Sequence, residues 1–183
     1  MFVSIRDARS MQDDRQWIEE SYKEYLDDLT RVSLNTGMFP AFGAYSGDSP
    51  AEFGDRGPDM MARWFADGSS YPFVILRDKE PQGFALVSRS MMKRNVVDFR
   101  MAEFFVVRRA RRHGVGREAA ELIFNRFDGR WEIVEFLRNQ AAVAFWRNIV
   151  GSYTHGRFDE VVMQGEVRHT FRSEPTHSNI KAI

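Results

Sequence analysis

The sequence predicts a mixed α/β fold, in which a central sheet of mostly antiparallel strands is flanked by helices. Apolar stretches of strand length alternate with segments of helical period. The expected order of elements, β-α-α-β-β-β-α-β-α-β, suits a mixed sheet with helices on its faces. No repeat, low-complexity tract or linker divides the 183 residues, a length that one sizeable core accommodates. We therefore expect a single domain over residues 1–172 and a flexible tail over residues 173–183.

The N-terminal part predicts a strand followed by a long helix. Residues 2–6 alternate weakly between polar and apolar side chains. Over residues 12–32 the apolar side chains recur at helical spacing, and Asp13 and Asp14 lie near the start, where the helix dipole favours carboxylates. The opposite face is acidic, and it is either a solvated surface or an attractor for a cationic acceptor; it carries Glu19, Glu20, Glu24, Asp27 and Asp28.

Residues 33–57 have no clear period and are rich in glycine and proline, which predicts a long loop. The aromatic side chains within it, among them Phe39 and Phe42, either cover a substrate or fill the core. A short helix is expected over residues 58–66, since Pro58 suits a first helical position and Gly68 suits a stop.

The rest of the chain alternates between strands and helices. A hairpin with a five-residue loop at 78–82 is expected first, followed by a third strand that leads into a helix. The expected strands are 71–76, 83–89, 96–107 and 131–136, the expected helices are 115–127 and 139–150, and a last strand or hairpin spans 161–167.

Composition excludes several functions. Lys+Arg and Asp+Glu both number 26, and a formal net charge of zero argues against coating nucleic acid or an anionic membrane. The absence of cysteine excludes disulfides, thiol nucleophiles and cysteine-ligated zinc. The N-terminus lacks the layout of a signal peptide, and no apolar run approaches the ~20 residues of a membrane span. We expect a cytoplasmic protein.

The stretch from Glu103 to Arg117 predicts a phosphate site. It consists of an apolar strand, a basic turn with Gly114 and Gly116, and the start of an amphipathic helix. The first amides of a helix lack intrahelical partners, and the dipole favours an anion there. Glycine lets the backbone approach the ligand, and arginine adds charge. We expect a cradle for a nucleotide or cofactor phosphate at about residues 111–117.

Two motifs resemble those of the GCN5-related N-acetyltransferase (GNAT) family. Arg111-x-x-Gly114-x-Gly116 resembles the acetyl-CoA-binding motif, and Asn139-x-x-Ala142-x-x-Phe145-Trp146 resembles the second cofactor motif on the following helix. The resemblance implies the GNAT fold, with acetyl-CoA as co-substrate and no metal. It also implies transfer of the acetyl group to a primary amine of a small molecule or peptide, by direct attack in a ternary complex. The assembly implied is a monomer or homodimer.

The resemblance assigns cofactor roles to individual positions. The backbone amides that follow Arg111 would hold the pyrophosphate; they belong to Arg112, His113, Gly114, Val115, Gly116 and Arg117. Phe105, Val106 and Val107 would lie beside the pantetheine arm and the thioester, in a splayed strand. Asn139 and Phe145, with Trp146 of the same motif, would contact the CoA arm from the second helix.

The catalytic groups are less directly indicated. Glu103 stands three residues before Val106, where members resembling polyamine acetyltransferases carry an acidic residue. It is expected to act as a base or to bind the acceptor, and the alternative is a surface carboxylate at a sheet edge. The family's usual acid, a tyrosine, is replaced by Trp146, whose indole cannot act as an acid at neutral pH. Tyr153, Tyr25 or water would then supply the proton. Tyr25, Phe39 and Phe42 are expected to contact the acceptor.

Two other functions stay open. The basic run of Arg108, Arg109, Arg111, Arg112 and Arg117 could form a nucleic-acid patch. A non-catalytic acyl-CoA-binding module is possible because Trp146 replaces the usual acid. The four histidines, His113, His155, His169 and His177, show no metal-site spacing.

Overall fold

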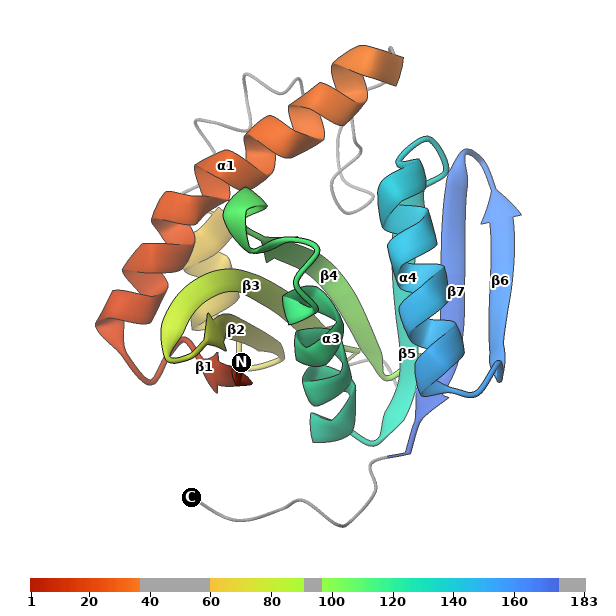
Figure 1. Ribbon diagram of the computed structural model, residues 1–183. Helices are drawn as coiled ribbons and strands as arrows, with labels where there is room; N and C mark the ends of the chain where they lie inside the picture. The colour runs from red at the N-terminus through yellow and green to blue at the C-terminus, as the bar shows by residue number, and fades with distance from the viewer. Residues whose placement is uncertain (37–59, 91–96, 175–183) are drawn as a thin grey trace.

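The structure, a computed structural model, describes residues 1–36, 60–90 and 97–174, which form a seven-stranded sheet flanked by helices (Figure 1). The strand order is β1-β2-β3-β4-β5-β7-β6, and every neighbouring pair is antiparallel except β4 and β5. The predicted mixed, mostly antiparallel sheet is therefore confirmed. The strands are β1 (Val3–Asp7), β2 (Ser70–Arg77), β3 (Glu80–Arg89), β4 (Phe99–Val106), β5 (Gly129–Phe136), β6 (Phe158–Met163) and β7 (Glu166–Ser173).

The helices cover the two faces of the sheet. Helices α3 (Val115–Arg126) and α4 (Gln140–Tyr153) lie side by side over one face, which we call the α3/α4 face (Figure 1). Helix α1 (Gln12–Thr36) packs on β3 from the other side, the α1 face. Residues 60–66 are helical as well, and a 3-10 turn, η2 (Arg108–Ala110), joins β4 to the loop before α3.

Several element boundaries differ from the prediction. The predicted five-residue loop at 78–82 is wrong, because Asp78 and Lys79 take φ angles of 50° and 74° and close the β2–β3 hairpin as a two-residue turn. Helix α1 continues to Thr36, and the last element is a complete hairpin, β6–β7. Ser173 is the buried last residue of β7, while residues 175–183 of the expected tail lie outside the described residues.

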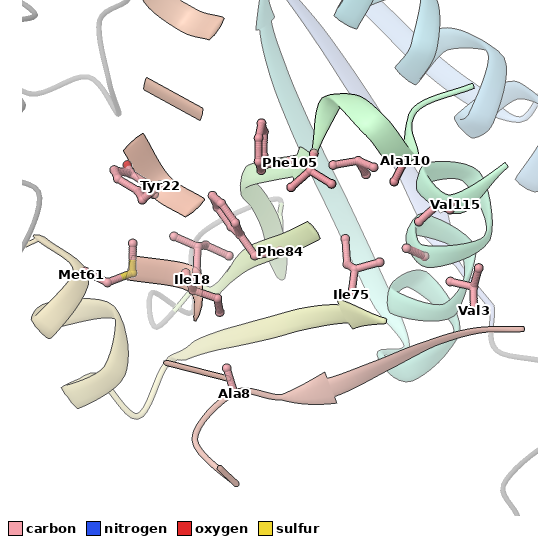
Figure 2. Packing of buried hydrophobic residues seen from close by; sticks show 14 residues of the cluster. Val3, Ala8, Ile18, Tyr22, Met61, Ile75, Phe84, Phe105, Ala110 and Val115 are labelled. Atoms are coloured by element: carbon pink, nitrogen blue, oxygen red, sulfur yellow. The ribbon is translucent and has the colours of Figure 1, made fainter. Parts of the chain in front are cut away.

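On the α1 face, α1 packs on the sheet through an apolar cluster that includes the rings of Tyr22, Phe84 and Phe105 and extends to Val115 of α3 (Figure 2). Ile18 and Tyr22 of α1 stand four residues apart, so they project from one side of the helix onto Phe84 of β3. The ring of Phe84 also lies 5.5 Å from that of Phe105 on β4, and Met61 closes the cluster. Each such buried side chain stabilises the fold by roughly 1.5–3 kcal/mol.

A second cluster fills the α3/α4 face around Trp131 of β5. The Trp131 ring lies 5.2 Å from Phe124 of α3 and 5.3 Å from Phe99 of β4. Its indole N–H donates to the Ser173 hydroxyl at 3.0 Å, which ties the end of β7 to the centre of the sheet. This cluster also contains Trp146 of α4, so the second motif helix is anchored directly on β5.

A β-bulge in β4 reverses the side from which its later residues project. Val87 of β3 faces Met101, but the preceding residue, Leu86, faces Glu103, so Ala102 is an extra residue in β4. Because side chains alternate along a strand, one extra residue turns the following side chains to the opposite face. Glu103 and Phe105 therefore project to the α1 face, whereas Met101 projects to the α3/α4 face.

Strands β4 and β5 diverge after a short paired stretch. Their parallel register comprises three residue pairs and ends at Met101 and Ile133. Both strands continue beyond that point, to Val106 and Phe136, and they separate as they do so (Figure 1). The C-terminal halves of these two central strands are therefore not paired with each other, and we call this unpaired stretch the opening between β4 and β5.

Lowering the pH is expected to destabilise the fold through His169 on β7. Its side chain is fully buried, its Nε2 lies 2.9 Å from the Glu160 carboxylate, and its Nδ1 has no hydrogen-bond partner within the described residues. Burial lowers the pKa of His169, and the bond to Glu160 only partly opposes this effect. The unfolded chain therefore takes up a proton below pH ~6.5 more readily than the folded chain does.

The free energy of unfolding should thus decrease as the pH falls below ~6.5, at a rate of at most about 1.4 kcal/mol per pH unit for this one group. Urea denaturation at several pH values measures the slope. The His169→Gln variant keeps the Glu160–Arg147 pair but cannot titrate at this position, so its slope between pH ~7 and ~5.5 should be smaller. Equal slopes in the two proteins would contradict the assignment.

Candidate active site

The start of α3 has the geometry of an anion cradle. Gly114 precedes the helix with φ 82°, in the left-handed region that glycine tolerates, and no side chain caps the helix. The first intrahelical bond runs from the Glu118 amide to the Gly114 carbonyl at 3.0 Å. The amides of the first turn, those of Val115, Gly116 and Arg117, precede that bond and are available to an anion.

Gly116 brings the two sequence motifs together. A Cβ atom at this position would lie 3.2 Å from the ring of Phe145 on α4, closer than ordinary packing allows. The Phe145 ring in turn packs 5.8 Å from that of Phe104 on β4. The absence of a side chain at Gly116 thus lets α4 approach the cradle and the end of β4.

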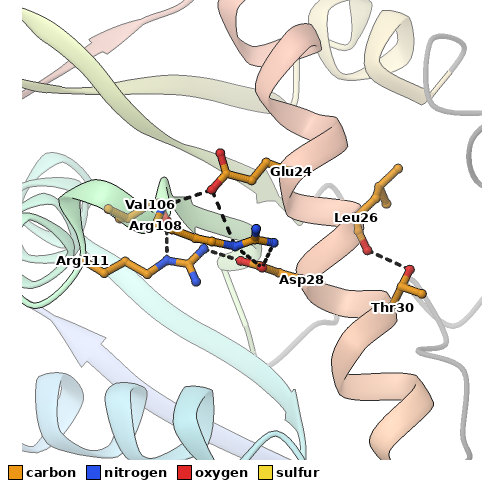
Figure 3. A network of polar contacts seen from close by, with 7 residues as sticks. All are labelled: Glu24, Leu26, Asp28, Thr30, Val106, Arg108 and Arg111. Atoms are coloured by element: carbon orange, nitrogen blue, oxygen red, sulfur yellow. Dashed lines mark hydrogen bonds and ion pairs between the residues drawn. The ribbon is translucent and has the colours of Figure 1, made fainter.

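Two arginines of the basic run are held by carboxylates of α1 (Figure 3). Arg108 and Arg111 both pair with Asp28, and the Arg108 amide donates to Glu24 at 3.0 Å. Burial alone would raise the pKa of Asp28, but the hydrogen bonds from Arg111 and Arg108 outweigh burial and lower it. Two members of the acidic face of α1, Glu24 and Asp28, therefore bind the segment between β4 and α3 instead of forming only a solvated surface.

The Arg111 side chain also supports the end of β4. Its Nε donates to the Val106 carbonyl at 2.7 Å, and its guanidinium lies 5.3 Å from the centre of the Phe105 ring. With Arg117 paired to Glu121, three of the five arginines proposed for a nucleic-acid patch have carboxylate partners. This pairing reduces the positive charge that the run presents.

The residues of the second motif have distinct positions at the start of α4. The Asn139 side chain caps the helix by accepting from the Ala142 amide at 3.3 Å. Phe145 is partly buried beside the cradle, whereas Trp146 is only 2% exposed. The Trp146 indole N–H donates to a Glu135 carboxylate oxygen at 2.9 Å.

Glu103 is a buried carboxylate at the opening between β4 and β5. It is 9% exposed, lies on a central strand and accepts a hydrogen bond from the Tyr25 hydroxyl of α1. The alternative of a surface carboxylate at a sheet edge is therefore wrong. The pKa of Glu103 is raised to about 8, and burial is the largest cause. The hydrogen bond from Tyr25 acts in the opposite direction, and the charge of Glu135 adds to the rise.

The two tyrosines of α1 lie beside Glu103. The Tyr25 ring packs 5.6 Å from Phe84 and 5.7 Å from Phe105, which directs its hydroxyl to the carboxylate. The Tyr22 hydroxyl is buried, and no hydrogen-bond partner for it lies among the described residues. Burial raises the pKa values of both tyrosines well above 10, so both stay neutral in the physiological range.

Tyr153 lies apart from these groups. It is the last residue of α4, whereas Asn139 caps the N-terminus of that helix and Trp146 lies near its middle. Its hydroxyl donates to Asn125 at 2.9 Å, and its ring packs on Phe124 of the second cluster. Burial raises the pKa of Tyr153 to about 12. The structure thus brings Tyr25, but not Tyr153, to Glu103.

Glu135 and Asp28 are site residues that the sequence reasoning did not single out. The alternation of β5 places Glu135 on the same side as Trp131 and Ile133, so an acidic residue on an apolar side was the available signal. Burial raises the pKa of Glu135 to about 7, and the Trp146 bond acts in the opposite direction. Asp28 gave no comparable signal, since it belonged to an acidic run.

The remaining candidates are less informative. Phe39 and Phe42, like His177, lie outside the described residues. His113 Nδ1 lies 2.7 Å from the Arg111 carbonyl, and within the described parts of the chain no group of three or more His, Asp or Glu side chains is arranged to hold a metal. No helix among the described residues is both long and apolar enough to cross a bilayer.

Comparisons with known proteins agree with this geometry. The model of the Acetyltransferase (GNAT) family matches residues 38–151, more than half of the chain. An acetyltransferase from Thermus thermophilus shares the fold with a TM-score of 0.64 at 15% identity, over 94% of this chain and 97% of that chain. The PaiA N-acetyltransferase from Thermoplasma acidophilum, in complex with coenzyme A, has a TM-score of 0.56 at 10% identity, over 94% and 99% of the two chains. Curated protein sequences give no significant match.

Proposed function

Since this chain belongs to the acetyltransferase (GNAT) family, we propose that it transfers the acetyl group of acetyl-CoA to a primary amine. The acceptor is a small molecule or a peptide, and its nitrogen attacks the thioester directly while both substrates are bound. The observation that carries this proposal is the separation of β4 from β5 beside a buried carboxylate, Glu103, on the strand that precedes the uncapped start of α3.

The chain's own groups fit a CoA molecule. The first-turn amides of α3, with the backbone of residues 111–114, suit a pyrophosphate, because they combine unpaired donors with the positive end of the helix dipole. Phe105, Val106 and Val107 would lie beside the pantetheine arm where β4 has separated from β5. Asn139, Phe145 and Trp146 would border the same arm from α4. The bound thioester supplies the activated acyl carbon.

Glu103 is our candidate for the base that removes a proton from the acceptor amine. Its carboxylate lies on the α1 face beside Tyr25, so the acceptor would approach from that side. A pKa of about 8 makes it a stronger base than an exposed glutamate, while a useful fraction is ionised at neutral pH. Tyr25 orients the carboxylate by its hydrogen bond.

Binding and turnover can be tested separately. We expect acetyl-CoA to raise the thermal unfolding temperature, because a ligand that binds the folded chain alone stabilises it. A panel of amines, assayed by release of free CoA thiol, should then identify an acceptor. No binding of acetyl-CoA would exclude both an acetyltransferase and an acyl-CoA-binding module. Binding without turnover of any amine would favour the module.

The nucleic-acid alternative has its own signature. Phosphate contacts release counterions, so binding to generic DNA would weaken steeply as the salt concentration rises. We expect no such binding at physiological ionic strength, because much of the basic run is paired with carboxylates. A salt-sensitive fluorescence-anisotropy signal with duplex DNA would support the alternative.

A further inference from the structure

Glu103, which is buried, and Glu135, which is partly buried, differ from the other buried carboxylates among the described residues, because neither is paired with a cation. Asp14 pairs with Arg6, and Glu132 pairs with Arg100 and Arg168. Glu103 instead accepts from the Tyr25 hydroxyl, and Glu135 accepts from the Trp146 indole. Enclosed charges are normally paired, and one that is not tends to hold a proton. The pKa values of both side chains are accordingly raised, so the pair can retain a proton at neutral pH.

The two carboxylates border the same opening from opposite faces of the sheet. Each lies two residues beyond the last β4–β5 pair, Met101 and Ile133. The bulge turns Glu103 to the α1 face, whereas Glu135 keeps the side of Trp131 and points to Trp146 on α4. The two groups are close enough for the charge of Glu135 to raise the pKa values of both Glu103 and Tyr25.

This arrangement places Glu103 on the face from which the acceptor would approach and Glu135 on the face where the CoA arm would lie. In the proposed function the acceptor meets the thioester from the α1 face, while the CoA arm is bordered by α4. Resting on that proposed function, we propose that Glu135 donates the proton that the CoA sulfur takes up as the thioester bond breaks, with Trp146 as the residue that positions its carboxyl. Glu135 would thus fill the role for which Trp146 itself is chemically unsuited.

The proton balance of the step requires one proton on the pair. The nitrogen lone pair of the neutral amine forms the C–N bond, and the electron pair of the broken C–S bond leaves on sulfur. The proton of the Glu135 carboxyl passes to that sulfur, and the surplus proton of the nitrogen passes to the Glu103 carboxylate. The pair holds one proton before and after the step, and only its position has changed. An acceptor that arrives as an ammonium ion first loses one proton to solvent.

The required distribution, with the proton on Glu135 and Glu103 ionised, is a minor but accessible state of the pair. The pKa of Glu135 is raised to about 7 and that of Glu103 to about 8, and the two ionisations belong to the pair. Because the pKa of Glu103 is the higher of the two, the state with the proton on Glu135 is about tenfold less populated than the state with the proton on Glu103, and it is the state from which the step proceeds. The other titratable groups that face the pair, Tyr22 and Tyr25, have pKa values well above 10 and stay neutral.

The Glu135→Gln variant tests the proposal through its pH profile. For the wild type we expect a bell-shaped dependence of kcat/KM on pH, because one proton must be present on the pair. In Glu135→Gln the alkaline limb should disappear, since the group that loses its proton there is gone. The acid limb should move to lower pH, because the charge of Glu135 no longer raises the pKa of Glu103. We expect kcat to fall about 10²-fold, with the KM of the acceptor unchanged.

Two further variants make the test specific. Trp146→Phe removes the indole donor that favours the ionised form of Glu135, so its alkaline limb should move to higher pH. Asp128→Asn removes an exposed carboxylate that is paired with Arg172, and it should leave the profile unchanged. An unaltered alkaline limb and kcat in Glu135→Gln would overturn the proposal. A raised acceptor KM with unchanged kcat would overturn it as well, because Glu135 would then only bind the amine.

A second measurement does not depend on turnover. The thiol of bound CoA can be titrated by the ultraviolet absorbance of its thiolate. If the ionised Glu135 carboxylate lies beside the sulfur, it disfavours the thiolate, so the midpoint in Glu135→Gln should lie about one pH unit lower than in the wild type. Equal midpoints would overturn the proposal even if no acceptor is known. Failure of the wild type to bind CoA would instead overturn the proposed function, and the role of Glu135 with it.

Discussion

Replacing Glu103 with glutamine is expected to lower kcat for acetyl transfer by about 10²–10⁴-fold, the usual contribution of a positioned general base. The amide has nearly the shape of the carboxyl group but cannot accept the proton of the amine. Acetyl-CoA should bind as in the wild type, because Glu103 projects to the α1 face and the cradle lies at the start of α3. Steady-state kinetics with a saturating acceptor, together with calorimetric titration of acetyl-CoA, measures both effects.

The same substitution should stabilise the folded chain at alkaline pH. Burial raises the pKa of Glu103 to about 8 from a normal value of 4.5, so the folded state holds a proton that the unfolded state releases. The free energy of unfolding of the wild type therefore decreases as the pH rises from ~4.5 to ~8. The introduced amide does not ionise, and the Glu103→Gln variant should gain stability relative to the wild type as the pH rises through this range, as measured by urea denaturation. Activity equal to that of the wild type, or a pH-independent stability difference, would contradict these assignments.

Replacing Gly114 with glutamate is expected to lower the affinity for acetyl-CoA by at least about 100-fold. A carboxylate at the start of α3 would repel the phosphates that the helix dipole otherwise attracts. The residue also has φ 82°, where a side chain costs roughly 1–2 kcal/mol in backbone strain. Calorimetric titration with acetyl-CoA measures the affinity, and thermal unfolding measures the strain.

Gly156 provides a matched control for this substitution. It also has φ 82°, in the turn between α4 and β6, and a Cβ atom there would meet nothing within 4 Å. Gly156→Glu should therefore show a similar loss of stability but bind acetyl-CoA normally. If Gly114→Glu bound acetyl-CoA as well as Gly156→Glu does, the cradle could not be at the start of α3.

The parts of the fold that were predictable are those encoded by local patterns. The period of the apolar residues predicted the helices and strands of the described chain to within a few residues. Gly114 and Gly116 predicted the turn before α3, because a side chain would be unfavourable at both positions. Gly114 takes a positive φ, and Gly116 leaves room for the ring of Phe145. The uncapped helix start that we propose as the phosphate cradle could be predicted for the same reason.

The rest could not be predicted because it depends on contacts between distant residues. The turn at Asp78 and Lys79 has positive φ angles without glycine or asparagine, so its sequence suggested a longer loop. Glu103 meets Tyr25 only through the packing of α1 on the sheet, and Glu135 meets Trp146 only through the packing of α4 on β5. The residues to which we assign proton transfer belong to such pairs.

The bulge at Ala102 determines the face of the sheet on which the proposed base, Glu103, lies. It changes the face to which alternate residues of β4 point: Phe99 and Met101 point to the α3/α4 face, whereas Glu103 and Phe105 point to the α1 face. In a strand that alternated regularly through Ala102, Glu103 would point to the same face as Met101, towards the aromatic cluster around Trp131. In the proposed reaction the acceptor lies on the α1 face and the CoA arm is bordered by α4, and the number of residues in β4 places Glu103 on the acceptor's side.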